Sequence, residues 1–66
     1  MNTIVTSREE LLAASRKIVK EQGIQALNMR AVAAAANVAV GSVYNYFPSK
    51  AELVTATVQD LSLIHI

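Results

Sequence analysis

The segment NMRAVAAAANVAVGSVYNYFPSK, residues 28–50, contains two short helical patterns separated by a turn. Asn28 is a residue type that caps helix N-termini, and apolar residues then recur at helical spacing as far as Ala36. Asn37 follows as a stop signal, because Asn tolerates the left-handed backbone conformation that ends a helix. The pattern predicts a helix over residues 28–36 and a turn directly after it.

A further short helix is expected over residues 40–46, because Pro48 lacks the amide that would continue it. Val43 and Phe47 are four residues apart, so both should face the core. Their burial would turn the other side of this helix outward. The side chains expected on that outward side are those of Ser42, Asn45 and Tyr46, with Tyr44 at its flank.

Two serines predict where the flanking helices begin. Ser7 and Ser49 are each followed three residues later by a glutamate, which is the capping-box pattern. In this pattern the serine hydroxyl accepts the backbone amide of the glutamate, and the glutamate carboxylate accepts the backbone amide of the serine. Helices are therefore expected over residues 8–22 and 49–60. Gly23 follows the first of them, where a left-handed residue ends a helix at little steric cost.

Helices account for the whole pattern, since no strand, repeat or linker is visible. The 66 residues suit one small domain, because domains usually have about 50 residues or more. We predict an all-α fold over residues 1–60, a short helical bundle in which a homeodomain-like three-helix unit with a helix-turn-helix is followed by the start of a fourth helix. The core is expected to use most of Leu11, Ile18, Val32, Val43, Phe47 and Leu53.

Composition removes several classes of function. The chain has no Cys and a single His, His65, so it offers neither a disulfide nor a metal-binding cluster, and no cofactor is expected. The longest apolar stretch, residues 31–41, is well short of the roughly 20 residues of a membrane-spanning helix. No secretory signal is visible either, so a cytoplasmic protein without membrane contact is expected.

Charged residues favour binding over catalysis. The adjacent carboxylates of Glu9 and Glu10 point about 100° apart on a helix, so they do not suit paired acid and base chemistry, and no enzyme is expected. All six basic residues lie within the first 51 residues, which contain three glutamates. This surplus would attract a polyanion, although a solvated helix face of mixed charge gives the same count.

The string from Gly41 to Lys50 gathers groups that suit nucleic acid. Gly41 lets backbone amides approach phosphates. The hydroxyls of Ser42 and Tyr44 and the Lys50 ammonium can donate to phosphate oxygens, and Asn45 matches the adenine edge. Each residue also has a purely structural interpretation as a packing residue or a solvated group. Their gathering within ten residues favours a helix that enters a DNA major groove.

Residues Arg8 to Val54 resemble the DNA-binding domain of TetR-family transcriptional regulators. The residues that match this family's order and spacing are Gly23, Asn28, Arg30, Val32-Ala33, Gly41-Ser42-Val43-Tyr44, Tyr46-Phe47-Pro48-Ser49-Lys50 and Leu53. The chain departs from the pattern at three positions. Asn37 replaces the usual Gly, Ala39 replaces a Ser or Thr cap, and Val40 replaces a commonly polar residue.

The resemblance implies a repressor-type regulator that binds palindromic operators in double-stranded DNA as a homodimer. A small-molecule inducer in a separate C-terminal domain would release the operator. The DNA-contacting positions that the resemblance implies are Asn28, Arg30, Val40, Gly41, Ser42, Tyr44, Asn45, Tyr46 and Lys50. Among them Tyr44 and Lys50 would hold phosphate, and Arg30 would reach a phosphate or a guanine edge.

Two expectations remain, on the end of the chain and on an alternative function. The C-terminal ligand-binding domain is expected to be absent. The ending LSLIHI, residues 61–66, matches one reading frame of a transposon end used for shotgun libraries, so we expect a non-native tail there. The alternative function is a small helical protein-protein interaction or dimerisation module. Its faces would carry Leu11, Ile18, Leu53 and Val58.

Overall fold

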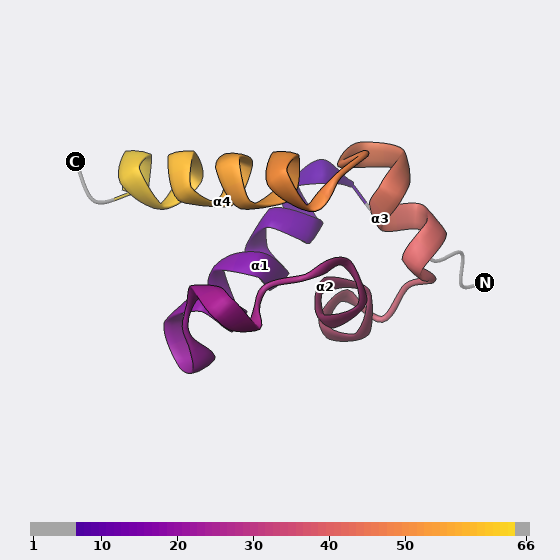
Figure 1. The fold of residues 1–66 in the computed structure, drawn as a ribbon, viewed down its shortest axis with the longest axis horizontal. Coiled ribbons are helices and arrows are strands. Elements are labelled where there is room, and N and C mark those ends of the chain that lie inside the picture. The colour runs from indigo at the N-terminus through magenta and orange to yellow at the C-terminus, as the bar shows by residue number, and fades with distance from the viewer. Residues whose placement is uncertain (1–6, 65–66) are drawn as a thin grey trace.

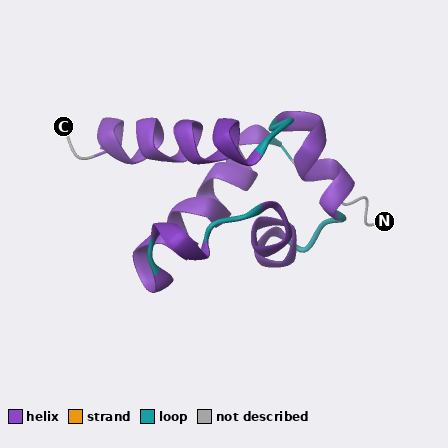
Figure 2. Ribbon diagram, viewed as in Figure 1, coloured by secondary structure: helices purple, strands orange, loops and turns teal. Residues whose placement is uncertain are grey.

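The computed structural model of the chain describes residues 7–64, and they form an all-helical fold (Figure 1). In chain order the elements are α1 (Arg8–Gln22), the 3-10 turn η1 (Ile24–Ala26), α2 (Met29–Ala36), α3 (Val40–Tyr46) and α4 (Lys50–Ile64). The described residues contain helices, turns and loops but no strand, which confirms the all-α prediction (Figure 2). Residues 1–6, and the last two residues of the expected tail, 65–66, lie outside the described range.

The first three α-helices begin and end within one residue of the bounds expected from the sequence. α4 differs, because it continues to Ile64 and the expected end at residue 60 is wrong. Residues 61–64 contain neither Gly nor Pro, so nothing in them interrupts the helix. The short turn η1 had no counterpart in the sequence pattern; its last hydrogen bond runs from the Leu27 N–H to the Ile24 carbonyl at 3.1 Å.

Serine caps begin the two long helices as predicted. The Ser7 Oγ accepts the Glu10 N–H at 3.2 Å, and the Ser49 Oγ accepts the Glu52 N–H at 3.3 Å. The reciprocal bond from the serine amide to the glutamate carboxylate forms at neither of these two described helix ends, so that half of the prediction is wrong. Both carboxylates lie in exposed residues, where water competes for them.

Gly23 ends α1 in a conformation that only glycine adopts readily. Its φ of 96° is positive as expected, but its ψ of 163° lies outside the left-handed helical region. The Gly23 N–H donates to the Val19 carbonyl at 3.0 Å, and the chain then turns away into η1. A Cβ at Gly23 would lie 3.0 Å from Oε1 of Gln25. The position therefore needs glycine for its backbone angles, whereas the exposed Gln25 side chain can move aside.

A single hydrophobic core joins the four helices, and all six residues predicted for it are buried. The other buried apolar residues are Leu12, Ala14, Leu27, Met29, Ala33 and Ala56. α1 lies at the centre of this core, since it packs on both α2 and α4, and α3 packs on α2 at one end of the molecule (Figure 1). This arrangement leaves the opposite side of α3 to solvent.

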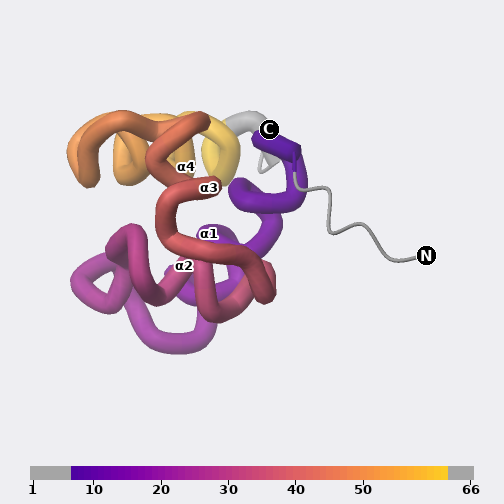
Figure 3. The backbone as a smooth tube through the Cα atoms, turned by 90° about the vertical axis from the view of Figure 1, so that its right-hand side faces the viewer, coloured from indigo at the N-terminus to yellow at the C-terminus, as the bar shows by residue number. Residues whose placement is uncertain are grey.

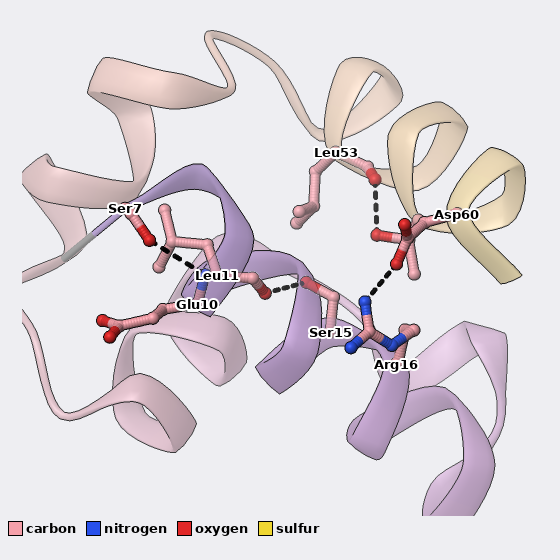
Figure 4. Close-up of polar contacts among 8 residues, drawn as sticks. Ser7, Glu10, Leu11, Ser15, Arg16, Leu53 and Asp60 are labelled. Atoms are coloured by element: carbon pink, nitrogen blue, oxygen red, sulfur yellow. Dashed lines mark hydrogen bonds and ion pairs between the residues drawn. The ribbon is translucent and has the colours of Figure 1, made fainter. Parts of the chain in front are cut away.

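Polar contacts accompany the packing of α4 on α1 (Figure 4). Ser15 and Thr57 are fully buried, and each donates its hydroxyl to the carbonyl four residues earlier, at 2.9 and 2.7 Å. Both hydroxyls are thereby satisfied inside the core. At the edge of the contact, the Arg16 guanidinium in α1 forms an ion pair with the Asp60 carboxylate in α4. Arg16 is half-buried, since this ion pair holds its side chain against α4.

Candidate nucleic-acid interface

The turn between α2 and α3 has the geometry that the sequence predicted. Asn37 adopts the left-handed conformation, with φ 60° and ψ 47°. Its N–H donates to the Ala34 carbonyl at 3.2 Å, and the Val38 N–H donates to the Ala33 carbonyl at 2.9 Å. These two bonds satisfy two of the last four carbonyls of α2, and the chain reverses into α3 within three residues. The helices α2 and α3, with the turn between them, form a helix-turn-helix unit.

α3 turns one side into the core and the other outward. Val43 is fully buried, and Phe47 at the end of the helix is 2% exposed. On the outward side, Tyr44 is the most open of the large side chains at 50% exposure, although the sequence placed it at the flank. Ser42 is half-buried rather than fully outward. The remaining outward residues of α3 are Val40, Gly41, Asn45 and Tyr46.

Gly41 occupies this outward side without any packing requirement for glycine. A Cβ built at Gly41 would meet no atom within 4 Å, and its φ is not positive. The fold therefore does not require a glycine there, unlike at Gly23. A bare backbone at an exposed position of α3 leaves room for an external group to come close to the chain.

The first turn of α3 lacks a side-chain cap. Ala39 has extended backbone angles suited to an N-cap, with φ −70° and ψ 149°, but its methyl group accepts no hydrogen bond. The Ser42 N–H instead donates to the Ala39 carbonyl at 3.0 Å. The departure noted in the sequence is therefore a real gap in the capping of this helix.

The remaining predicted contact residues lie at the ends of the neighbouring helices. Asn28 caps α2, since its Oδ1 accepts the Ala31 N–H at 2.8 Å, so it has a structural role as well as an exposed position. Arg30 is exposed in the first turn of α2, and Lys50 is exposed as the first residue of α4. Figure 3 views the molecule from the side of α3, which lies between α2 below and α4 above.

The nine predicted residues therefore belong to α3 and to the N-terminal ends of α2 and α4, the two helices between which α3 lies in Figure 3. Sequence reasoning missed one basic residue near the end of α3. The Cζ of Arg8, in the first turn of α1, lies 5.4 Å from the centroid of the Phe47 ring. This contact joins residues 39 positions apart, so no local pattern in the sequence signals it.

Other kinds of site find little support in the described part of the chain. No group of three or more His, Cys, Asp or Glu residues within it could hold a metal ion. None of its helices is both long enough and apolar enough to cross a membrane. Three of the four residues assigned to a partner-binding face, Leu11, Ile18 and Leu53, are buried inside the domain, and Val58 is 47% exposed. The alternative interaction module thus loses most of its proposed surface.

Comparison with known proteins gives a consistent result. The family model described as bacterial regulatory proteins, tetR family, matches residues 11–57. Among similar proteins, the HTH-type transcriptional repressor KstR of Mycolicibacterium smegmatis is 47% identical over 49 residues, which is 74% of this chain and 24% of the relative. KstR of Rhodococcus jostii is 45% identical over 49 residues, 74% of this chain and 23% of the relative.

An uncharacterized HTH-type transcriptional regulator of Mycobacterium bovis, Mb1581, is 47% identical over 47 residues, 71% of this chain and 23% of that protein. No solved structure matches the chain significantly. The chain spans about a quarter of the length of the relatives that it matches. None of these matches supports the alternative interaction module, and the matched family consists of DNA-binding regulators rather than enzymes, as predicted.

Proposed function

The chain belongs to the tetR family of bacterial regulatory proteins, and from this premise we propose that α2, the turn and α3 read an operator in double-stranded DNA. DNA-binding transcriptional regulation is the activity of this family. The observation that carries the proposal is the two-sided character of α3. Its inner residue Val43 is fully buried, while Tyr44 is 50% exposed. A short helix exposed in this way fits a major groove.

We assign the nine residues to three kinds of contact. On α3, the groove-facing residues are Val40, Gly41, Ser42, Asn45 and Tyr46, with the Asn45 amide suited to an adenine edge and Val40 to a thymine methyl. Tyr44 and Lys50 hold phosphates on the flanks of the groove. Arg30 reaches a phosphate or a guanine edge from the start of α2, beside Asn28.

The whole regulator is proposed to act as a homodimer on a palindromic operator. A two-fold dimer would place two copies of α3 in successive major grooves, with half-site centres about one helical turn, or a multiple of it, apart. The relatives from Mycolicibacterium smegmatis and Rhodococcus jostii are named as repressors, so we propose repression as the output, in the cytoplasm. Release by a small molecule would require a C-terminal domain beyond the matched region.

Selection of tight binders from a pool of randomised DNA duplexes would test the proposal and identify the operator. Lys50→Ala should weaken binding to every duplex and reduce the slope of log affinity against log salt by about 0.9, the value for one phosphate contact. Lys17→Ala removes the same charge from an exposed position of α1 that is not among the nine assigned residues, so it is the matched control. A chain that ignores duplex DNA even at low salt would overturn the proposal.

The variant Asn45→Ala distinguishes the reading of bases from contacts with the DNA phosphate backbone. If the Asn45 amide makes a bidentate contact with one base, the variant should lose about 1–3 kcal/mol of discrimination at a single base pair. Its affinity for unrelated duplexes should stay close to that of the unchanged chain, because no phosphate contact is lost. An equal loss on every sequence would refute the base-reading role of Asn45.

A further inference from the structure

Arg8 has an unusual position for an exposed basic side chain. It begins α1, yet its Cζ lies 5.4 Å from the centroid of the Phe47 ring, which belongs to the residue that ends α3. This distance falls within the range of a cation–π contact. Phe47 is 2% exposed and its position is fixed by the core. The ring therefore offers a rigid support to a guanidinium that stays at the surface.

This contact brings Arg8 next to the start of α4. Arg8 borders a shallow open groove whose other lining residues are Ala51, Glu52, Thr55, Ala56 and Gln59. Ala51 directly follows Lys50 in the sequence. In both Figure 1 and Figure 3 the first turn of α1 lies beside the junction of α3 and α4. Arg8 thus lies beside the first turn of α4, the turn that Lys50 begins.

The charge of Arg8 is not neutralised within the described part of the chain. Arg16, further along α1, is paired with Asp60, whereas Arg8 has no carboxylate partner among the described residues, although Glu52 borders the same groove. Lys20 lies in the last turn of α1, at the opposite end of the helix. Arg8 is the basic residue of α1 that both carries an unpaired charge and lies at the end of α3.

We propose that Arg8 is a phosphate-contacting residue, held in place by the Phe47 ring, and that it binds the DNA backbone together with Lys50. A planar guanidinium can stack on an aromatic ring and still direct N–H groups in its own plane to phosphate oxygens. The contact with the ring restricts the side chain before DNA arrives, which reduces the entropy lost on binding. The inference rests on the proposed function, since it needs α3 to lie on a duplex.

The test measures binding of a short fluorescent duplex of arbitrary sequence over a series of salt concentrations. Arg8→Gln should reduce the slope of log affinity against log salt by about 0.9, as should Lys50→Gln. Lys20→Gln removes an equal charge from the far end of the same helix and should leave the slope unchanged. Thermal unfolding of each variant, followed by circular dichroism, separates loss of binding from loss of fold.

The possible results distinguish the inference from the proposed function. An unchanged slope for Arg8→Gln beside a reduced slope for Lys50→Gln would overturn the role of Arg8 alone, even if the melting temperature fell. Equal effects of Arg8→Gln and Lys20→Gln would indicate a general charge effect and overturn it too. No binding by the unchanged chain would overturn both proposals.

A second measurement needs no substitution. The chain has three arginines, Arg8, Arg16 and Arg30, so their Nε–Hε signals can be followed by NMR during a DNA titration. The Arg8 signal should shift with the duplex, while the Arg16 signal, from a guanidinium already bound to Asp60, should stay in place. A stationary Arg8 signal in a titration that shifts the amides of α3 would refute the contact.

Discussion

Arg16 of α1 and Asp60 of α4 form an ion pair across 44 positions of sequence, joining the two 15-residue helices. Their side chains are 24% and 21% exposed, so the pair is partly shielded from solvent and from salt. It lies near the buried hydroxyl of Ser15, where α4 crosses α1 (Figure 4). The contact fixes α4 relative to the helix that organises the core.

Removal of this pair should destabilise the domain. Asp60→Asn keeps the size of the side chain but leaves the Arg16 charge without its partner, at a cost of about 1 kcal/mol. For a domain of this size the melting temperature should fall by about 4–8 °C. A double-mutant cycle with Arg16→Gln, followed by circular dichroism, isolates the coupling between the two residues. Strictly additive losses would show that the two side chains do not stabilise each other.

The gap in the capping of α3 offers a stabilising substitution. Ala39 already has extended backbone angles and is exposed, so a serine hydroxyl there could accept an amide of the first turn without a rearrangement. Ala39→Ser should raise the free energy of unfolding by about 0.5–2 kcal/mol, measured by urea or thermal denaturation. Ala39→Val adds bulk but no acceptor and is the control. If both variants melt at the same temperature, the missing cap does not limit stability.

Local chemistry explains which parts of the fold could be predicted. Ser7, Asn28 and Ser49 cap helices through bonds that span three residues, and Asn37 ends α2 through its own backbone, so short windows of sequence contain the whole signal. The outward side of α3 followed from one pair of apolar residues at helical spacing. These features determine where the helices begin and end and which side of α3 is buried.

Contacts between distant residues were beyond this kind of reasoning. The cation–π contact of Arg8 with Phe47 and the pairing of Arg16 with Asp60 depend on how α1 lies against α3 and α4, which no local pattern encodes. The half-buried state of Ser42 likewise depends on neighbouring helices. Gly23 has the positive φ expected from its residue type, but the path into η1 gives it a ψ of 163°, outside the left-handed helical region.

The positive φ of Gly23 makes this position intolerant of substitution. Its φ of 96° with ψ 163° is essentially restricted to glycine, and a Cβ would lie 3.0 Å from the Gln25 side chain. Gly23→Ala should lower the free energy of unfolding by about 1–3 kcal/mol, seen as an earlier midpoint in urea. Trimming the neighbour in a Gly23→Ala, Gln25→Ala double variant should recover little of the loss, because the backbone angles remain strained. Full recovery would attribute the cost to crowding instead.

Gly41→Ala should have the opposite effect on folding and a large effect on binding. A Cβ at Gly41 meets nothing within 4 Å and alanine favours helix, so stability should stay the same or rise by up to about 1 kcal/mol. If the bare backbone at Gly41 approaches a DNA phosphate, the added methyl group will collide with the duplex. Affinity should then fall about tenfold or more, which is 1.4 kcal/mol or more.

The thermal melt of Gly41→Ala serves as its internal control, since a variant that is as stable as the unchanged chain but binds DNA poorly has lost only the close approach. Gly41→Ser should bind as poorly as the alanine variant, because the obstacle is the Cβ itself and a hydroxyl does not remove it. A Gly41→Ala variant that binds duplex DNA with full affinity would instead place the duplex further from α3 at this position. In that case Tyr44 and Lys50, at the flanks of α3, would make the contacts with the DNA.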